Sequence, residues 1–210
     1  MGPPTQADLL LDGPAQAPLT VALAHGAGAP MDSPFMNRVA AGLAARGHRV
    51  VRFEFAYMAA RRTGGRRGAP DREPVLRARW KEIVERLGGG SRVVVGGKSM
   101  GGRIASLIAD EVRARGLVCL GYPFHPPGAP QKLRTAHLAD LRTPTLVVQG
   151  TRDAFGTRDD VAGYRLSPAI RVHWIEGGDH SFKPPARSGR TEAGNVDEAI
   201  AAVAGFVAAL

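Results

Sequence analysis

The chain has 210 residues, 44% of them apolar, and a formal net charge of +9. This length and composition suit one domain with a sizeable core, and no apolar run reaches the roughly 18 to 20 residues of a membrane span. The charge does not indicate a nucleic-acid partner, because four of the 28 basic residues are lysine and the arginines are scattered over the predicted helices.

The amino terminus and the cysteine content favour a cytoplasmic location. Residues 1–6 lack the basic and apolar segments of a secretory signal. Cys119 is the only cysteine and lies in an apolar run, so we expect a buried thiol and no disulfide framework. We therefore expect a single domain, residues 1–210, in which residues 1–18 form a lead-in.

Apolar runs and helical apolar periodicity alternate along the chain. In the first half we expect an edge strand at 9–11, a strand at 19–24, a helix from 34 to Gly47, a strand at 49–55, a basic loop at 56–70 and a helix at 71–87. In the second half we expect strands at 92–96, 117–121, 145–149 and 170–175, and helices from 100 to Gly116, at 159–166 and at 195–210.

Two helix starts have recognisable capping signals. Ser33 followed by Pro34 is typical of an N-cap and a first helical residue. Asn195 and Glu198 have the spacing of a capping box, so we expect the last helix to begin at Asn195.

This alternation predicts an α/β fold with a mostly parallel sheet of about six to seven strands and helices on both faces. Residues 123–143 contain too few positions for a separate cap domain. Ligands of such sheets bind beyond the carboxyl ends of the strands, so polar residues at those ends are the candidates for a site.

The stretch Gly97-Lys98-Ser99-Met100-Gly101 lies between a predicted strand and a predicted helix. This G-x-S-x-G pattern is typical of a serine held on a sharp, strained turn, where small flanking residues let strand and helix pass closely. The same segment resembles the end of a phosphate-binding loop. That alternative fails because its first glycine would fall at Arg92, and a strand replaces the loop.

A serine hydroxyl becomes a nucleophile when a histidine accepts its proton and a carboxylate orients that histidine. Ser99, Asp153 and His180 occur in the chain order Ser, Asp, His, each just past the end of a different predicted strand. We therefore predict that these three residues form a catalytic triad.

Other residues compete for two of these roles. Asp159 and Asp160 are alternative acids, although they fall on a short predicted helix, and Asp153 could simply be a turn-forming residue. His125 is the main alternative to His180, because it also follows a strand. We interpret His125 as part of a pocket wall.

An acyl-transfer site also needs backbone amides that stabilise an oxyanion. We expect the amides of Met100 and Ala27 in this role, with Gly28 as an alternative donor and as a substrate contact. The glycines at 25–29 could equally serve only to form a tight turn.

The chain resembles the α/β-hydrolase superfamily, and within it bacterial predicted hydrolases related to the testis-expressed and NSL-complex-subunit domain proteins. The matching stretches are HGAGA at 25–29, RR at 61–62 with PDR at 70–72, GGKSMGGR at 96–103, YPFHP at 122–126, QGTRDAFG at 149–156 and GDHS at 178–181. The resemblance implies the same triad and no definite substrate. Relatives similar to dienelactone hydrolase usually carry a cysteine nucleophile, so Ser99 favours ordinary ester chemistry.

Two further groups of residues are candidates for substrate binding. Arg61 and Arg62 follow a strand, and a guanidinium there would suit an anionic substrate group, although a solvated loop is the simpler interpretation. Phe124 and His125 would line the pocket.

The sequence therefore predicts a serine hydrolase that acts on a small ester or related acyl substrate through an acyl-enzyme. We expect a shallow pocket, no cofactor, no metal, and neither a nucleic-acid nor a membrane partner; the oligomeric state stays open. The alternative is a catalytically silent protein-interaction module on the same fold. The resemblance implies this alternative, because eukaryotic relatives belong to chromatin complexes.

Overall fold

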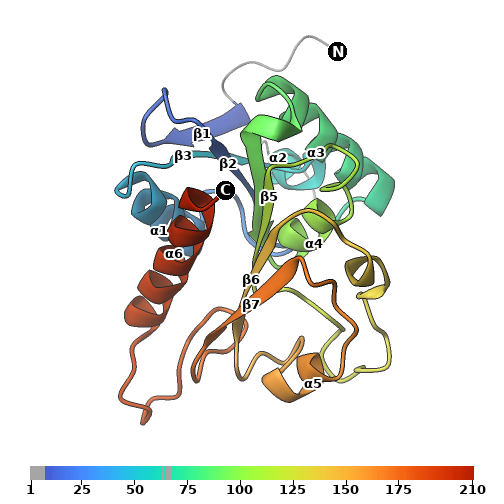
Figure 1. Cartoon of the computed structure of the whole chain (residues 1–210), viewed down its shortest axis with the longest axis vertical. Helices are drawn as coiled ribbons and strands as arrows, with labels where there is room; N and C mark the ends of the chain where they lie inside the picture. Colours follow the sequence, from blue (N-terminus) through green and yellow to red (C-terminus); the bar gives the residue numbers. More distant parts are fainter. Residues whose placement is uncertain (1–7, 63, 65–67) are drawn as a thin grey trace.

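A computed structural model describes residues 8–62, 64 and 68–210 of the chain. Its centre is a seven-stranded sheet, which agrees with the predicted six to seven strands, and the strand order is β1-β3-β2-β4-β5-β6-β7 (Figure 1). The strands are β1 Leu9–Asp12, β2 Thr20–Ala24, β3 Arg49–Phe53, β4 Val93–Lys98, β5 Gly116–Leu120, β6 Thr145–Gly150 and β7 Ile170–Ile175. β1 pairs antiparallel with β3, and every other pairing is parallel.

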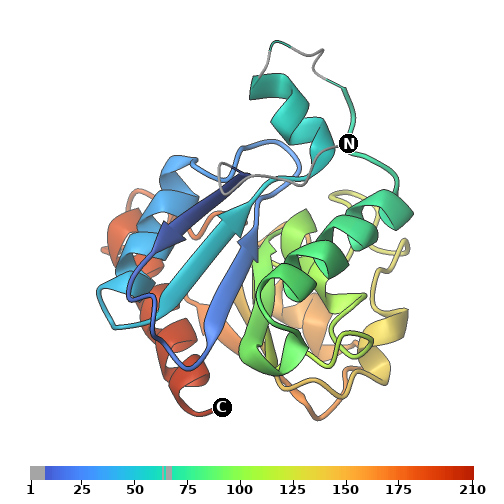
Figure 2. The same cartoon turned by 90° about the horizontal axis from the view of Figure 1, so that it is seen from above.

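Helices cover both faces of the sheet (Figures 1 and 2). They are α1 Pro34–Ala44, α2 Ala56–Arg62, α3 Glu73–Arg86, α4 Met100–Ser106, α5 Arg158–Ala162 and α6 Glu192–Ala208, with 3-10 turns at Gly90–Arg92 and Ala136–Ala139. α1 and α6 pack on one face, while α3 and α4 pack on the other. Within the described residues no separate cap domain covers the sheet, and none of the helices there is both long and apolar enough to cross a membrane.

The two faces of the sheet carry two separate apolar cores because strand side chains alternate. In β2, Ala22 and Ala24 belong to the α3/α4 core, whereas Val21 and Leu23 belong to the α1/α6 core. Burial on both faces explains why the central strands are continuous apolar runs rather than alternating ones.

The predicted basic loop at 56–70 is wrong in its first half, which forms α2. The carbonyl of Phe55 accepts hydrogen bonds from the amides of Met58 and Ala59, and Tyr57 and Met58 are buried. Burial of this apolar face stabilises a helix that the arginine-rich sequence conceals. Residues 63 and 65–67 of the predicted loop lie outside the described part.

Several helix boundaries also differ from the prediction, among them the end of α5, which lies at Ala162 rather than at residue 166. α6 begins at Glu192 rather than Asn195, because Thr191 is its N-cap and the buried Asn195 side chain donates to the Phe182 carbonyl. α4 ends at Ser106, well before Gly116, which opens β5 instead. A Cβ at Gly116 would lie 2.6 Å from Leu210, so this glycine serves close packing and not helix termination.

The N-caps of α1 and α6 differ in a way that a stability measurement can detect. The Thr191 hydroxyl accepts a hydrogen bond from the Gly194 amide at 3.0 Å, whereas the Ser33 side chain makes no capping hydrogen bond. We expect Thr191→Ala to lower the free energy of unfolding by about 1 kcal/mol. The matched control Ser33→Ala should change it by less than about 0.5 kcal/mol. Equal effects in urea titrations would contradict this account of the two caps.

Candidate active site

Ser99 lies on a sharp turn between β4 and α4, with a left-handed backbone at φ 50° and ψ −115°. The flanking glycines are needed because the turn passes over β2. A Cβ at Gly97 would lie 2.1 Å from the Ala24 carbonyl oxygen, and one at Gly101 would lie 2.4 Å from the same atom. Side chains at either position would therefore force the turn that carries Ser99 away from the sheet.

The three residues predicted to form the triad meet at the carboxyl edge of the sheet. His180 Nε2 is 2.9 Å from Ser99 Oγ, and His180 Nδ1 is 2.8 Å from Asp153 Oδ2. A carboxylate can only accept, so Nδ1 carries the proton that is donated to Asp153, and Nε2 is free to accept from the serine hydroxyl. Asp153 is fully buried, whereas the His180 side chain is 24% exposed and can meet a substrate.

Asp153 is held by more than His180. Its Oδ1 accepts from the Phe155 amide at 2.9 Å, and its Oδ2 also accepts from Gln149 Nε2 at 2.9 Å. The Phe155 ring in turn packs on the His180 imidazole, with centroids 4.2 Å apart. These contacts fix the orientation of both the carboxylate and the imidazole.

Gln149 is a contributor that the sequence analysis did not identify. It is fully buried in β6; besides Asp153, its amide nitrogen lies 3.2 Å from the Tyr122 carbonyl and 3.1 Å from the Gly156 carbonyl. Its side-chain oxygen accepts from the Tyr122 amide at 2.7 Å. The signal in the sequence is a lone polar amide at the end of an otherwise apolar strand run.

The competing residues occupy other places. Asp160 closes a capping box with Thr157 at the start of α5, and Asp159 is exposed on the same helix. His125 is buried, with Nδ1 2.9 Å from the Pro126 carbonyl and Nε2 3.7 Å from Asp160 Oδ2. None of these side chains contacts Ser99.

Phe124, predicted to line the pocket with His125, is fully buried. A Cβ at Gly156 would lie 2.6 Å from its ring, and Tyr122 and Tyr164 pack beside it. Phe124 and His125 therefore pack against the loop that carries Asp153 and do not form an open surface.

The loop after β2 runs directly over the serine. A Cβ at Gly26 would lie 3.8 Å from Ser99 Cβ. The Tyr57 hydroxyl donates to the Ala27 carbonyl at 3.0 Å, and His25 Nδ1 donates to the Gly26 carbonyl at 2.6 Å. A trans peptide points its N–H opposite to its C=O, so holding the Gly26 carbonyl also fixes the direction of the Ala27 amide.

His25 is suited to this role because it is neutral. Burial lowers the pKa of its imidazole, and Nε2 accepts from the Phe55 amide at 3.2 Å while Nδ1 donates. In the part of the chain that the structure describes, the amides of Ala27 and Met100 donate to no other protein group. Ala27 and Gly28 are exposed, so the loop faces solvent next to Ser99.

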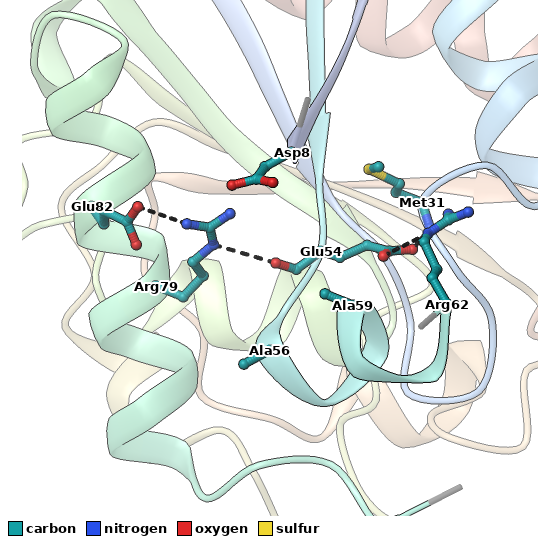
Figure 3. A pocket seen from close by; sticks show the side chains of 8 residues that line it. All are labelled: Asp8, Met31, Glu54, Ala56, Ala59, Arg62, Arg79 and Glu82. Carbon is teal, nitrogen blue, oxygen red and sulfur yellow. Dashed lines mark hydrogen bonds and ion pairs between the residues drawn. The ribbon is translucent and has the colours of Figure 1, made fainter. Parts of the chain in front are cut away.

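The two predicted arginines have different surroundings. Arg62 binds Glu54 through Nε at 2.8 Å and Nη2 at 2.7 Å, and binds Asp32 through Nη1 at 2.9 Å and Nη2 at 2.6 Å. Figure 3 shows the Arg62 side chain directed at Glu54. The two carboxylates raise the pKa of Arg62 further above its usual value.

Arg61 has no carboxylate within ion-pair distance in the described residues, although Gly68 accepts from its Nη2 at 2.6 Å. Its guanidinium lies 5.2 Å from the centre of the Tyr57 ring, the same tyrosine that holds the Ala27 carbonyl. Among the residues that the structure describes, Arg61 thus carries an unpaired charge close to the loop over Ser99, whereas the charge of Arg62 is neutralised.

A cavity of about 460 Å³ lies beside Arg62, lined by residues of α2, α3 and the ends of β1 and β3 (Figure 3). Its lining residues are Asp8, Met31, Glu54, Ala56, Ala59, Arg62, Arg79 and Glu82. It includes none of the three residues predicted to form the triad. Within residues 8–62, 64 and 68–210, no group of three or more His, Cys, Asp or Glu side chains is arranged to hold a metal ion.

Solved structures share this fold at low sequence identity. An α/β serine hydrolase homologue from Coxiella burnetii is 18% identical, with a TM-score of 0.68 over 94% of this chain and 89% of that chain. An α/β serine hydrolase without lid from Xanthomonas campestris is 19% identical, with a TM-score of 0.70 over 95% and 87%. Dienelactone hydrolase from Anabaena variabilis is 22% identical, with a TM-score of 0.71 over 95% and 90%.

At these identities the structural likeness concerns the fold alone. A family model described as "Alpha/beta hydrolase domain" matches residues 17–208, which is most of the chain. The fold, the serine turn and this match lead to one conclusion: the chain belongs to the alpha/beta hydrolase domain family.

Proposed function

We propose that this protein is a serine hydrolase that cleaves small esters or related acyl substrates through Ser99, His180 and Asp153. The observation that carries the proposal is the continuous hydrogen-bond path from Ser99 Oγ through both imidazole nitrogens to Asp153, with distances of 2.9 and 2.8 Å. Both lie within the range at which a base takes a proton from a nucleophile.

In the first half of the reaction, Ser99 Oγ attacks the acyl carbonyl carbon and its proton passes to His180 Nε2. The tetrahedral intermediate then collapses, the bond to the leaving alcohol breaks, and that alcohol takes the proton from Nε2. The product is an ester between Ser99 and the acyl group. Asp153 stays ionised and stabilises the imidazolium through its hydrogen bond to Nδ1.

In the second half, a water molecule gives a proton to Nε2 while its oxygen attacks the acyl-enzyme. The bond to Ser99 Oγ breaks, the serine regains the proton, and the acid leaves. The negative oxygen of each tetrahedral intermediate would be bound by the amides of Ala27 and Met100, with Gly28 as the alternative donor. The amides of Ala27 and Met100 have no acceptor among the described residues, which supports this role, since an amide already oriented toward a charge costs no reorganisation during the reaction.

The finer features of the proposal rest on the sequence. The motifs at residues 61–62, 96–103 and 149–156 favour the subgroup related to the testis-expressed and NSL-complex-subunit domain proteins. The absence of a separate cap in the described residues favours short acyl groups. A cytoplasmic location and the lack of a nucleic-acid or membrane partner stay predictions, as does the single-domain organisation.

Arg61 gives the proposal a substrate preference. No carboxylate of the described part of the chain pairs with it, and its Tyr57 contact brings it next to the loop that would bind the oxyanion. A guanidinium in such a place pairs well with a carboxylate on the substrate. We therefore assign the recognition of acidic acyl groups to Arg61 and a structural ion pair to Arg62.

The first test is covalent labelling with a fluorophosphonate probe. The wild type should react at Ser99, and Ser99→Ala should lose both the labelling and the hydrolysis of p-nitrophenyl butyrate. The control is Ser181→Ala, which changes an exposed serine next to His180 and should leave both intact. A folded wild type that neither reacts nor hydrolyses a panel of acyl esters and thioesters would contradict the enzyme proposal and favour the silent interaction module.

A second prediction concerns Gln149. In Gln149→Met the buried Asp153 loses one donor and the Tyr122 amide loses its acceptor. We expect kcat to fall by roughly tenfold or more, because misplacing a catalytic group by a fraction of an ångström weakens the transition state, while KM changes little. Steady-state kinetics measure this, and an unchanged kcat would contradict a positioning role for Gln149.

A third prediction separates the two arginines. We expect Arg61→Ala to raise KM for mono-p-nitrophenyl succinate about tenfold, the loss of one charge-assisted contact, and to leave p-nitrophenyl butyrate unaffected. Arg62→Ala should instead lower the free energy of unfolding by about 1–3 kcal/mol, since buried Glu54 loses its cation. Equal effects of Arg61→Ala on both esters would exclude its role in recognising an acid.

A further inference from the structure

Lys98 is the residue before the nucleophile and the last residue of β4. Its ammonium donates a hydrogen bond to the main-chain carbonyl of His180 at 2.5 Å. This contact joins the strand that carries Ser99 to the loop after β7 that carries His180. Besides the contact between the Ser99 and His180 side chains, Lys98 therefore provides a second link between the segments that carry these two residues.

The space around this ammonium is closely filled. Gly121 has a left-handed backbone at φ +68°, and a Cβ there would lie 2.8 Å from Lys98 Nζ, 2.9 Å from the His180 carbonyl oxygen and 3.3 Å from His180 Nδ1. The Phe35 ring centre lies 5.6 Å from Nζ. The glycine at 121 thus leaves room for the ammonium against the histidine.

Two carboxylates act on Lys98, and the loop that carries His180 packs against it. Asp153 and Asp179 act on it as negative charges, and both carboxylates are already engaged by other donors. His180 offers its carbonyl. Burial is the larger effect and lowers the pKa of Lys98 to about 8. Removing part of this ammonium from water opposes the gain from its hydrogen bond, so the contact is not by itself evidence of stabilisation.

We propose that Lys98 is a positioning residue for the hydrolase reaction: its charged ammonium holds the His180 carbonyl so that the imidazole stays in line with Ser99. This inference rests on the proposed function. The role is geometric, because a cation beside the imidazolium does not itself stabilise that charge. A charged donor makes a hydrogen bond about twice as strong as a neutral one, so loss of the proton loosens the loop.

The pH dependence of rate and stability separates this role from a structural one. Lys98 has a lower pKa folded than unfolded, so between about pH 8 and about pH 10.5 the unfolded chain binds more protons at this site. The contribution of this group to stability therefore rises over that window. Activity should fall in the same window, so the loss cannot come from unfolding caused by Lys98.

The experiment compares the full-length wild type with Lys98→Met, Lys98→Arg and the control Lys183→Met. Lys183 lies in the loop after β7 that also carries His180, and its side chain is exposed. Each protein is assayed for kcat, KM and fluorophosphonate labelling rate from pH 6 to pH 10, and its Tm is measured. The titration of Lys98 is followed by ¹³C NMR, where Lys98→Met removes one of only four lysine signals.

We expect the wild-type kcat to fall several-fold with a midpoint that matches the Lys98 titration near pH 8. Lys98→Met should have a kcat about tenfold lower at pH 7, a KM within twofold, no fall above pH 8 and an equal or higher Tm. Lys98→Arg should recover part of the rate and move the fall upward by more than one pH unit, because a guanidinium keeps its charge. Lys183→Met should match the wild type.

Several results would overturn the inference. The role of Lys98 is excluded, while the hydrolase proposal stands, if an active wild type shows no fall of kcat at alkaline pH. It is excluded equally if that fall of kcat is unchanged in Lys98→Met or in Lys98→Arg. If neither variant folds, a Lys98 signal in the wild type that titrates away from the kinetic midpoint excludes it equally. A wild type inert toward both the esters and the probe would instead overturn the hydrolase proposal and this inference together.

Discussion

The left-handed backbone of Ser99 is the constraint on which the rest of the site depends. A non-glycine residue in this conformation carries strain of about 1–3 kcal/mol, which the surrounding structure must hold in place. β2 provides this restraint, because the turn passes so close to it that a Cβ at Gly97 or at Gly101 would clash with the Ala24 carbonyl oxygen. The neighbouring pairing of β2 with β4 in the centre of the sheet therefore both permits and enforces the exposure of the serine hydroxyl.

The parallel sheet then brings distant residues together at low cost. Ser99 and His180 are 81 positions apart and Asp153 and His180 are 27 apart, yet each lies shortly after a strand whose carboxyl end is at the same edge of the sheet. Only short loops remain to be positioned, and buried polar contacts do so. Gln149 links the end of β5 to the Asp153 loop, and Tyr57 and His25 hold the loop after β2.

Patterns with a local cause could be predicted from the sequence, and contacts between distant segments could not. β7 has the predicted bounds, 170–175. Ser99, Asp153 and His180 lie within hydrogen-bond distance of one another in the order Ser–His–Asp, and their chain order and their places after strands were enough to predict this. The helix at 56–62 was missed because its arginines obscure two buried residues. The different surroundings of Arg61 and Arg62 depend on carboxylates from other segments, and neighbouring identical side chains carry no sign of that difference.

Two kinds of movement of the His180 imidazole are restricted, and different residues restrict each of them. Rotation of the ring is limited by Asp153, which binds Nδ1, and by Phe155, which packs on its face. Displacement of the main chain is limited by the hydrogen bond from Lys98 to the carbonyl. Asp153 follows β6 and Lys98 ends β4, and these strands lie on either side of β5. A shift of one strand end therefore does not release both restraints. Such a division suits the role of general base proposed for His180, since proton transfer depends on both the distance and the angle to Ser99.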